Sequence, residues 1–102
     1  MQEFVDLINK YGGDMPNAMG VPEDAVSKAA KMAICKVNID TDLRLASTGA
    51  IRRFLANNPA EFDPRKYLQE SIKEMKAICM DRNEAFGSAG NAPKLKPLSL
   101  EA

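Results

Sequence analysis

The sequence predicts an α/β fold, in the form of a mostly helical piece of a larger parallel sheet or barrel. Three observations lead to this prediction. Apolar residues recur at helical spacing in four segments, residues 34–40 alternate between apolar and polar side chains, and that segment lies between helices. A single strand cannot satisfy its own backbone hydrogen bonds, so it must pair within a larger sheet or mediate dimerisation. The helix–strand–helix order favours the larger sheet.

The first predicted helix is short and amphipathic. Gly12-Gly13 ends it, because glycine adopts the left-handed backbone conformation that often follows a helix. Its apolar face consists of Phe4, Leu7, Ile8 and Tyr11.

A predicted loop at residues 14–20 separates this helix from the second one. The second helix starts at Pro22, which suits the first helical position, and runs to about Ala33. Glu23 and Asp24 place negative charge at the positive end of its dipole.

The predicted strand at residues 34–40 is the clearest strand signal in the chain. It has a polar face, although both faces of a parallel strand are normally covered by apolar layers. The apolar Cys35, Val37 and Ile39 alternate with the polar Lys36, Asn38 and Asp40.

The third predicted helix covers about residues 42–57, with Thr41 or Asp42 as its N-cap. Asn57-Asn58-Pro59 ends it. Its predicted inner face consists of Leu43, Ala46, Ala50 and Phe54.

The fourth predicted helix opens with Asp63 as the cap and Pro64 at the first position, and Gly87 ends it. Residues 88–102 are predicted to be a mobile tail. The predicted inner stripe of this helix consists of Leu68, Ile72, Met75, Cys79 and Phe86.

Composition excludes several classes of function. The 14 Lys and Arg residues balance the 14 Asp and Glu residues, and no basic block indicates nucleic acid or an anionic membrane as a partner. No apolar run approaches a membrane span and the first residues lack a signal-peptide pattern, so we expect a cytoplasmic protein. Cys35 and Cys79 fit reduced, partly buried thiols better than a disulfide. The sequence has no histidine, which excludes a histidine base and the common histidine-based zinc sites.

The strongest site signal is the junction at residues 38–42, where the strand ends and a helix begins. Backbone N–H groups and the dipole at a helix start bind anions, Thr41 adds a hydroxyl, and barrel active sites lie at the carboxyl ends of strands. A phosphate-bearing substrate would fit there. The alternative is that Thr41 and Asp42 only cap the helix, but the polar face formed with Lys36, Asn38 and Asp40 favours a site.

Arg65, in the first turn of the fourth helix, is the second candidate. A guanidinium can bind a phosphate through two parallel hydrogen bonds. From composition alone, however, an arginine near a helix start is usually a solvated surface residue.

Several motifs resemble class II fructose-bisphosphate aldolases and occur in the order found in that family. The longest is AICKVNIDTDLRLASTGAIRRFLANNPAEFDPRKYL, and INKYGGDM, GVPEDAVSKAAK and FGSAG extend the resemblance over nearly the whole chain. The resemblance implies that residues 1–102 are the C-terminal part of one (β/α)8 barrel, the TIM-barrel fold. Residues 34–40 would then be its eighth strand, followed by its eighth helix and an added C-terminal helix.

The resemblance also implies a reaction, the reversible cleavage of fructose 1,6-bisphosphate to dihydroxyacetone phosphate and glyceraldehyde 3-phosphate. Zinc would be the cofactor, with its histidine ligands and the catalytic aspartate upstream of Met1, so the chain alone should be inactive. Asn38 would contact the dihydroxyacetone phosphate moiety, and Asp40 and Thr41 would hold its phosphate. Arg65 would reach the other phosphate across the subunit interface of a homo-oligomer.

Two alternatives remain open at this point. The related tagatose-bisphosphate aldolases tend to carry an alanine-threonine pair where this chain has Asp40-Thr41, so the motif favours fructose. The other alternative is a non-catalytic helical module that dimerises through its lone strand.

Overall fold

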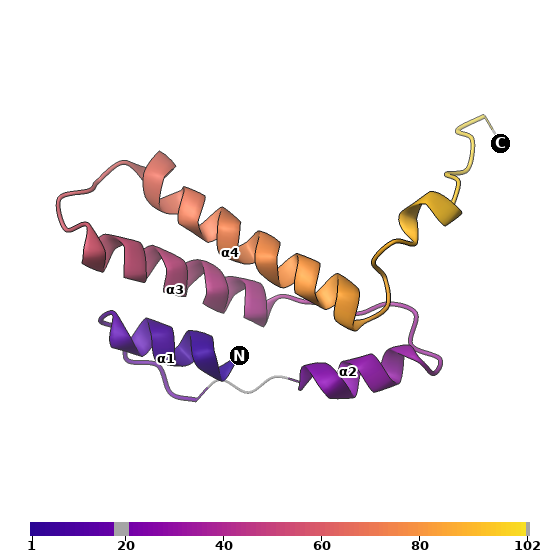
Figure 1. Cartoon of the computed structure of the whole chain (residues 1–102), viewed down its shortest axis with the longest axis horizontal. Coiled ribbons are helices and arrows are strands. Elements are labelled where there is room, and N and C mark those ends of the chain that lie inside the picture. The colour runs from indigo at the N-terminus through magenta and orange to yellow at the C-terminus, as the bar shows by residue number, and fades with distance from the viewer. Residues whose placement is uncertain (18–20, 102) are drawn as a thin grey trace.

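The computed structural model describes residues 1–17 and 21–101 and shows a helical chain built on one long hairpin (Figure 1). α3 and α4 lie side by side, α1 packs against α3, and α2 lies beside the C-terminal end of α4. Beyond α4 the chain extends away from the hairpin. The elements are α1 Gln2–Lys10, α2 Glu23–Ala30, α3 Thr41–Asn57, α4 Pro64–Ala85 and the short 3-10 helix η1 Ala92–Lys94.

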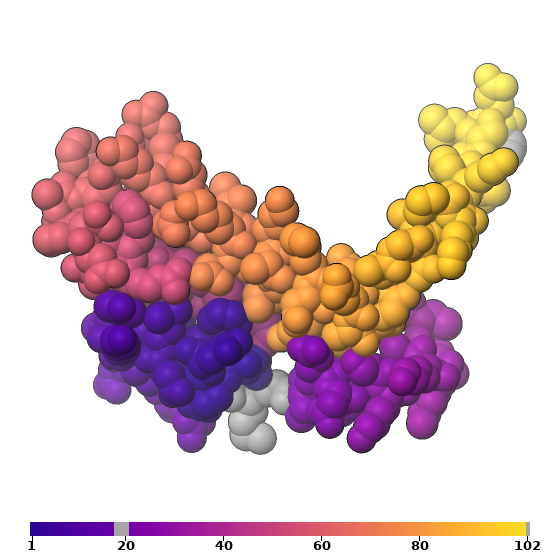
Figure 2. All heavy atoms as spheres, viewed as in Figure 1, coloured from indigo at the N-terminus to yellow at the C-terminus, as the bar shows by residue number. Residues whose placement is uncertain are grey.

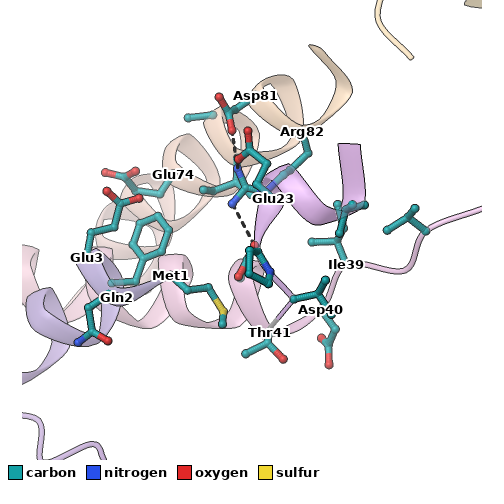
Figure 3. A pocket seen from close by; sticks show the side chains of 18 of the residues that line it. Met1, Gln2, Glu3, Glu23, Ile39, Asp40, Thr41, Glu74, Asp81 and Arg82 are labelled. Atoms are coloured by element: carbon teal, nitrogen blue, oxygen red, sulfur yellow. Dashed lines mark hydrogen bonds and ion pairs between the residues drawn. The ribbon is translucent and has the colours of Figure 1, made fainter. Parts of the chain in front are cut away.

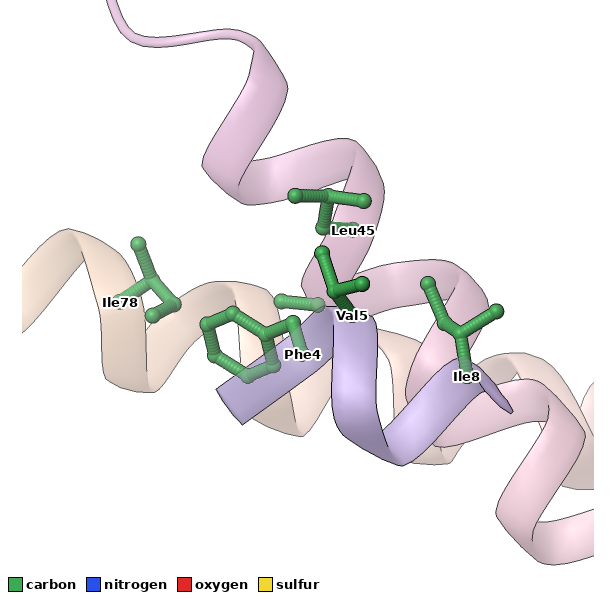
Figure 4. Packing of buried hydrophobic residues seen from close by; sticks show 6 residues of the cluster. Phe4, Val5, Ile8, Leu45 and Ile78 are labelled. Carbon is green, nitrogen blue, oxygen red and sulfur yellow. The ribbon is translucent and has the colours of Figure 1, made fainter. Parts of the chain in front are cut away.

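The small core lies where α1 meets α3 and the C-terminal half of α4. Phe4, Val5 and Ile8 of α1 pack against Leu45 of α3 and Ile78 of α4 (Figure 4). The predicted apolar faces of the first and third helices are therefore confirmed in part. Phe4, Ile8, Ala46 and Ala50 are buried as predicted, whereas Leu7, Tyr11, Leu43 and Phe54 are only half-buried.

Polar contacts join the two helices of the antiparallel α3–α4 hairpin (Figure 1). The hydroxyls of Ser47 and Ser71 are hydrogen-bonded at 2.6 Å, and Arg53 Nη2 donates to Glu74 Oε1 at 2.8 Å. Arg82 in the last turn of α4 also donates to Asp42 in the first turn of α3 at 3.0 Å. The start of α3 is therefore next to the end of α4.

α2 is held against α4 mainly by polar contacts, because it has no buried residue. The Ser27 hydroxyl donates to the Ala85 carbonyl at 2.8 Å, and Glu23 forms an ion pair with Arg82. α2 ends at Ala30, before the predicted Ala33, and Pro22 is its N-cap and not its first residue.

The predicted strand at residues 34–40 is wrong for this chain. Within residues 1–17 and 21–101 no segment forms a strand, and Ile34 and Val37 are 50% and 37% exposed. The alternating pattern is present, but a strand needs a neighbouring strand to receive its backbone hydrogen bonds. None of the described residues supplies one.

The inner stripe predicted for the fourth helix is also wrong in part. Leu68 and Ile72 are 44% and 64% exposed, whereas the neighbouring Ser71 and Ile78 are buried against α3 and α1. Cys79 and Cys35 are free and exposed, and not partly buried as predicted. The spacing of apolar residues predicts which side of a helix is buried, but the neighbouring helices decide which residues on that side are covered.

The helix ends agree with prediction at α4 and differ at α3. Asp63 caps α4 with Pro64 in its first turn, and Gly87, with φ +77°, follows it. At α3 the N-cap is Asp40, and not Thr41 or Asp42. The predicted loop includes residues 18–20 and the predicted tail includes Ala102, which lie outside the described residues.

The chain is extended and leaves much surface open. Its radius of gyration is 17.2 Å, whereas a compact domain of this length has about 13 Å. Its accessible surface is 7936 Å², against about 5,700 Å² for a compact monomer of the same mass. Figure 2 shows the C-terminal segment standing away from the helices. None of the helices in the described ranges is long and apolar enough to span a lipid bilayer.

Candidate phosphate-binding site

The start of α3 holds three of the four predicted site residues. Asn38 is exposed in the extended segment before the helix, Asp40 is the N-cap with φ −133° and ψ −57°, and Thr41 is the first helical residue. The first intrahelical hydrogen bond runs from the Arg44 N–H to the Asp40 carbonyl at 3.0 Å.

Asp40 leaves the helix start open. Its carboxylate pairs with Arg44 Nη2 at 3.3 Å, both side chains are 74% exposed, and among the described residues no side chain caps α3. The N–H groups of residues 41–43 precede Arg44, the first intrahelical donor, and have no acceptor within α3. They can therefore bind an anion together with the positive end of the helix dipole.

These residues border a hollow of about 1070 Å³ between α1, α2, α4 and the start of α3 (Figure 3). Asn38, Asp40 and Thr41 all line it, so the structure brings them together. Most of the charged side chains that line the hollow are negative. A carboxylate there repels a phosphate unless a neighbouring cation neutralises it. The charged side chains in its lining are Glu3, Glu23, Asp40, Asp42, Glu74 and Asp81, with Arg53 and Arg82.

Arg82 neutralises part of this charge, and sequence reasoning did not single it out. Its side chain is 13% exposed, its Nη2 donates to Asp42 Oδ2 at 3.0 Å, and its Nη1 pairs with Glu23 and Asp81. Burial alone would lower the pKa of Arg82, but the Asp42 hydrogen bond and the charges of Glu23 and Asp42 outweigh it and raise the pKa. Only the fold brings these helices together, so no local pattern indicated the cluster.

Arg65 lies at the start of α4 and is 89% exposed. Its Nε donates to both Asp63 carboxylate oxygens at 3.1 Å, and its Nη2 donates to Oδ2 at 2.8 Å. Asp63 also accepts the Arg65 backbone N–H at 3.0 Å. Hydrogen bonds from the Arg65 side chain and backbone lower the pKa of Asp63, and the side-chain bond raises the pKa of Arg65.

The structure does not bring Arg65 to the other three residues. The 17 residues of α3 form a helix about 25 Å long. Because the hairpin is antiparallel, Arg65 lies near the far end of α3 from Asp40 and Thr41. One bisphosphorylated sugar cannot bridge that separation within a single chain.

The residues present do not fit a zinc site. Among residues 1–17 and 21–101, no three His, Cys, Asp or Glu side chains are grouped so that they could hold a metal ion. The sequence also contains no histidine.

A segment with polar residues at its end that leads into an open helix start is typical of a phosphate-binding part of an α/β enzyme. Comparison with known proteins specifies the class. Residues 15–91 match the family described as class-II fructose-bisphosphate aldolase, and the chain belongs to this family.

Relatives agree with this assignment over almost the entire chain. Fructose-bisphosphate aldolase of Pseudomonas aeruginosa is 58% identical over 100 residues, which are 98% of this chain and 28% of that protein. The enzyme of Nostoc sp. PCC 7120 is 51% identical with the same coverage. Fructose-bisphosphate aldolase 2 of Rhodobacter capsulatus is 47% identical over 94% of this chain and 84% of that sequence. The chain thus spans about 28% of the length of the first two.

Proposed function

We propose that this chain is part of a cytoplasmic, zinc-dependent fructose-bisphosphate aldolase of glycolysis and gluconeogenesis. The reaction is the reversible aldol cleavage of fructose 1,6-bisphosphate to dihydroxyacetone phosphate and glyceraldehyde 3-phosphate. The observation that carries the proposal is the family match over residues 15–91, which includes Asn38, Asp40, Thr41 and Arg65.

The open start of α3 supports a role in binding one phosphate. Its first-turn N–H groups and the Thr41 hydroxyl donate to the dihydroxyacetone phosphate moiety, and Asp40 and Asn38 contact that moiety nearby. The Asp40 carboxylate is available for this role because it accepts no hydrogen bond from the first turn of α3 and pairs with an exposed arginine, Arg44.

Arg65 binds the other phosphate of the substrate in a neighbouring subunit. The position of Arg65 at the opposite end of the hairpin supports this assignment, since it cannot serve the site of its own chain. Its guanidinium pairs with Asp63 but is 89% exposed, so a neighbouring subunit can approach it. The functional enzyme is therefore a homo-oligomer.

The complete fold is a (β/α)8 barrel in which residues 34–40 pair as the eighth strand. The exposure of Ile34 and Val37, and the alternation of Cys35, Val37 and Ile39 with polar residues, support this pairing. Zinc is held by residues outside this chain, since the described residues provide no ligand group for it.

A chimera tests the proposal. In it, these 102 residues replace the matched segment of the Pseudomonas aeruginosa aldolase, which is 58% identical. Thr41→Ala should lower kcat/KM for fructose 1,6-bisphosphate, because it removes a hydroxyl donor to a charged ligand worth about 1.5–3 kcal/mol. Asp40→Ala should also lower it, because it removes an acceptor for a hydroxyl of the dihydroxyacetone phosphate moiety. Thr48→Ala, on the exposed side of the same helix, is the matched control and should have little effect.

Steady-state kinetics on both sugars separate the alternatives. If tagatose 1,6-bisphosphate is cleaved better than the fructose isomer, the substrate assignment is wrong. If neither Asp40→Ala nor Thr41→Ala changes KM or kcat, the phosphate does not bind at the start of α3.

A further inference from the structure

The guanidinium of Arg82 joins three helices at one point beside the candidate site. It contacts Asp42 in the first turn of α3, Glu23 at the start of α2 and its neighbour Asp81 on α4 (Figure 3). Asp42 is the most buried of the three carboxylates, at 19% side-chain exposure against 42% for Glu23 and 60% for Asp81. The Asp42 contact is therefore the one least weakened by solvent.

Arg82 does not face the candidate phosphate position directly. In Figure 3 the side chains of Asp40 and Thr41 point away from Arg82. Arg82 can act on that position through Asp42, which follows Thr41 in the chain and has a carboxylate that Arg82 holds at 3.0 Å.

Without a partner, Asp42 would work against phosphate binding in two ways. Its negative charge would repel a phosphate dianion bound within the same helical turn. A carboxylate near the N–H groups of a first turn is also attracted to them, and would compete with the phosphate for the same donors. An ion pair with Arg82 cancels the charge and holds the carboxylate toward α4.

We propose that Arg82 is a positioning residue for phosphate binding, which acts by neutralising Asp42 and by anchoring the start of α3 to the end of α4. This inference rests on the proposed aldolase function and deepens it. Arg82 touches neither substrate nor metal. It sets the charge and place of the helix start to which the phosphate binds.

The geometry predicts that lysine replaces Arg82 only partly. Nη2 contacts Asp42 while Nη1 contacts Glu23 and Asp81, so the planar guanidinium binds carboxylates on two sides at once. A lysine ammonium is a single point charge on a flexible stem. It retains the neutralising charge but not the two-sided anchoring.

The test uses the chimera described above with the variants Arg82→Ala, Arg82→Lys and Arg82→Ala/Asp42→Asn. Arg82→Ala should raise KM for fructose 1,6-bisphosphate about tenfold or more, as expected for loss of a charge-assisted contact, and should change kcat much less. The double variant should recover most of this loss, because it also removes the carboxylate charge. Arg82→Lys should lie between the parent and Arg82→Ala.

Ser47→Ala is the matched control, since Ser47 also joins α3 to α4, through a hydrogen bond with Ser71 at 2.6 Å, and does not line the hollow. A purely structural role for Arg82 would make Arg82→Ala resemble Ser47→Ala, with a loss of thermal stability and only a small change in KM. The KM increase of Arg82→Ala should also shrink as salt is added, because salt screens the repulsion from Asp42.

The remaining outcomes distinguish a failure of the Arg82 inference from a failure of the proposed function on which it rests. Equal effects of Arg82→Ala and Ser47→Ala on KM, no recovery in the double variant, or unfolding of both Arg82 variants would overturn the positioning role. An inactive parent chimera, or one unaffected by Asp40→Ala and Thr41→Ala, would overturn the proposed function itself.

Discussion

Two aspartates occupy the same helical position in this chain and behave differently. Asp63 caps α4 by accepting the Arg65 N–H, whereas Asp40 is the N-cap of α3 but turns its carboxylate to Arg44. The difference decides which helix start can receive a ligand. The N-terminal turn of α3 stays open, and at α4 the available group is the exposed guanidinium of Arg65.

Arg65 provides the sharpest prediction at the scale of a residue. In the chimera, Arg65→Ala should reduce cleavage of fructose 1,6-bisphosphate far more than cleavage of fructose 1-phosphate, which lacks the second phosphate. Arg65→Lys should restore only part of the preference, because an ammonium cannot form the two-point contact of a guanidinium. The ratio of kcat/KM for the two substrates is the measurement.

Asp63→Asn serves as the control for this prediction, since asparagine is also a good N-cap but does not form an ion pair with Arg65. It should leave the substrate ratio near that of the parent. Equal losses on both substrates in Arg65→Ala would indicate a folding or interface defect, and no loss on either would make Arg65 a surface residue.

At the scale of an element, the packing of the short helix α1 depends on the turn that ends it. Gly12 has φ +91°, and the Gly13 N–H donates to the Ile8 carbonyl at 2.9 Å. A Cβ on Gly13 would lie 2.7 Å from that carbonyl oxygen, which is backbone and cannot move aside easily. Ile8 is 1% exposed in the core, so a shift there would loosen the packing of α1 on α3.

We therefore expect Gly13→Ala to destabilise the chain by about 1–3 kcal/mol, the range of an overpacked site. The thermal midpoint of the 102-residue chain, followed by circular dichroism, measures the effect. Gly90→Ala is the control, because a Cβ there meets no atom within 4 Å, although its positive φ adds some local strain. A Gly13→Ala variant at least as stable as the parent would contradict this account of the end of α1.

At the scale of the whole molecule, the chain exposes more surface than it can bury by itself. The excess over a compact monomer is roughly 2,200 Å², and it includes Phe62, Leu68, Ile72 and Met80 on or near α4. Only a few side chains form the core. These features fit a segment that packs against further parts of a larger enzyme.

The 102-residue chain alone should show no aldolase activity, with or without added zinc. Its described residues supply phosphate contacts but no ligand group for a metal, and binding alone does not break the carbon–carbon bond. A coupled assay of the pure chain, run beside the active chimera, checks this expectation. Zinc-dependent cleavage by the chain alone would contradict it.

Local signals in the sequence determined the four helices, the cap of α4 at Asp63 and Pro64, and the family, because these features depend on neighbouring residues. They also placed Asn38, Asp40 and Thr41 at one junction. Only the tertiary structure decided that Ser71 and not Leu68 faces α3, that Arg65 lies far from Thr41, and that Arg82 holds Asp42. Those outcomes depend on which surfaces meet, and residues 34–40 show the same dependence: their alternating pattern has the period of a strand, but strand hydrogen bonds require a partner that the described chain does not provide.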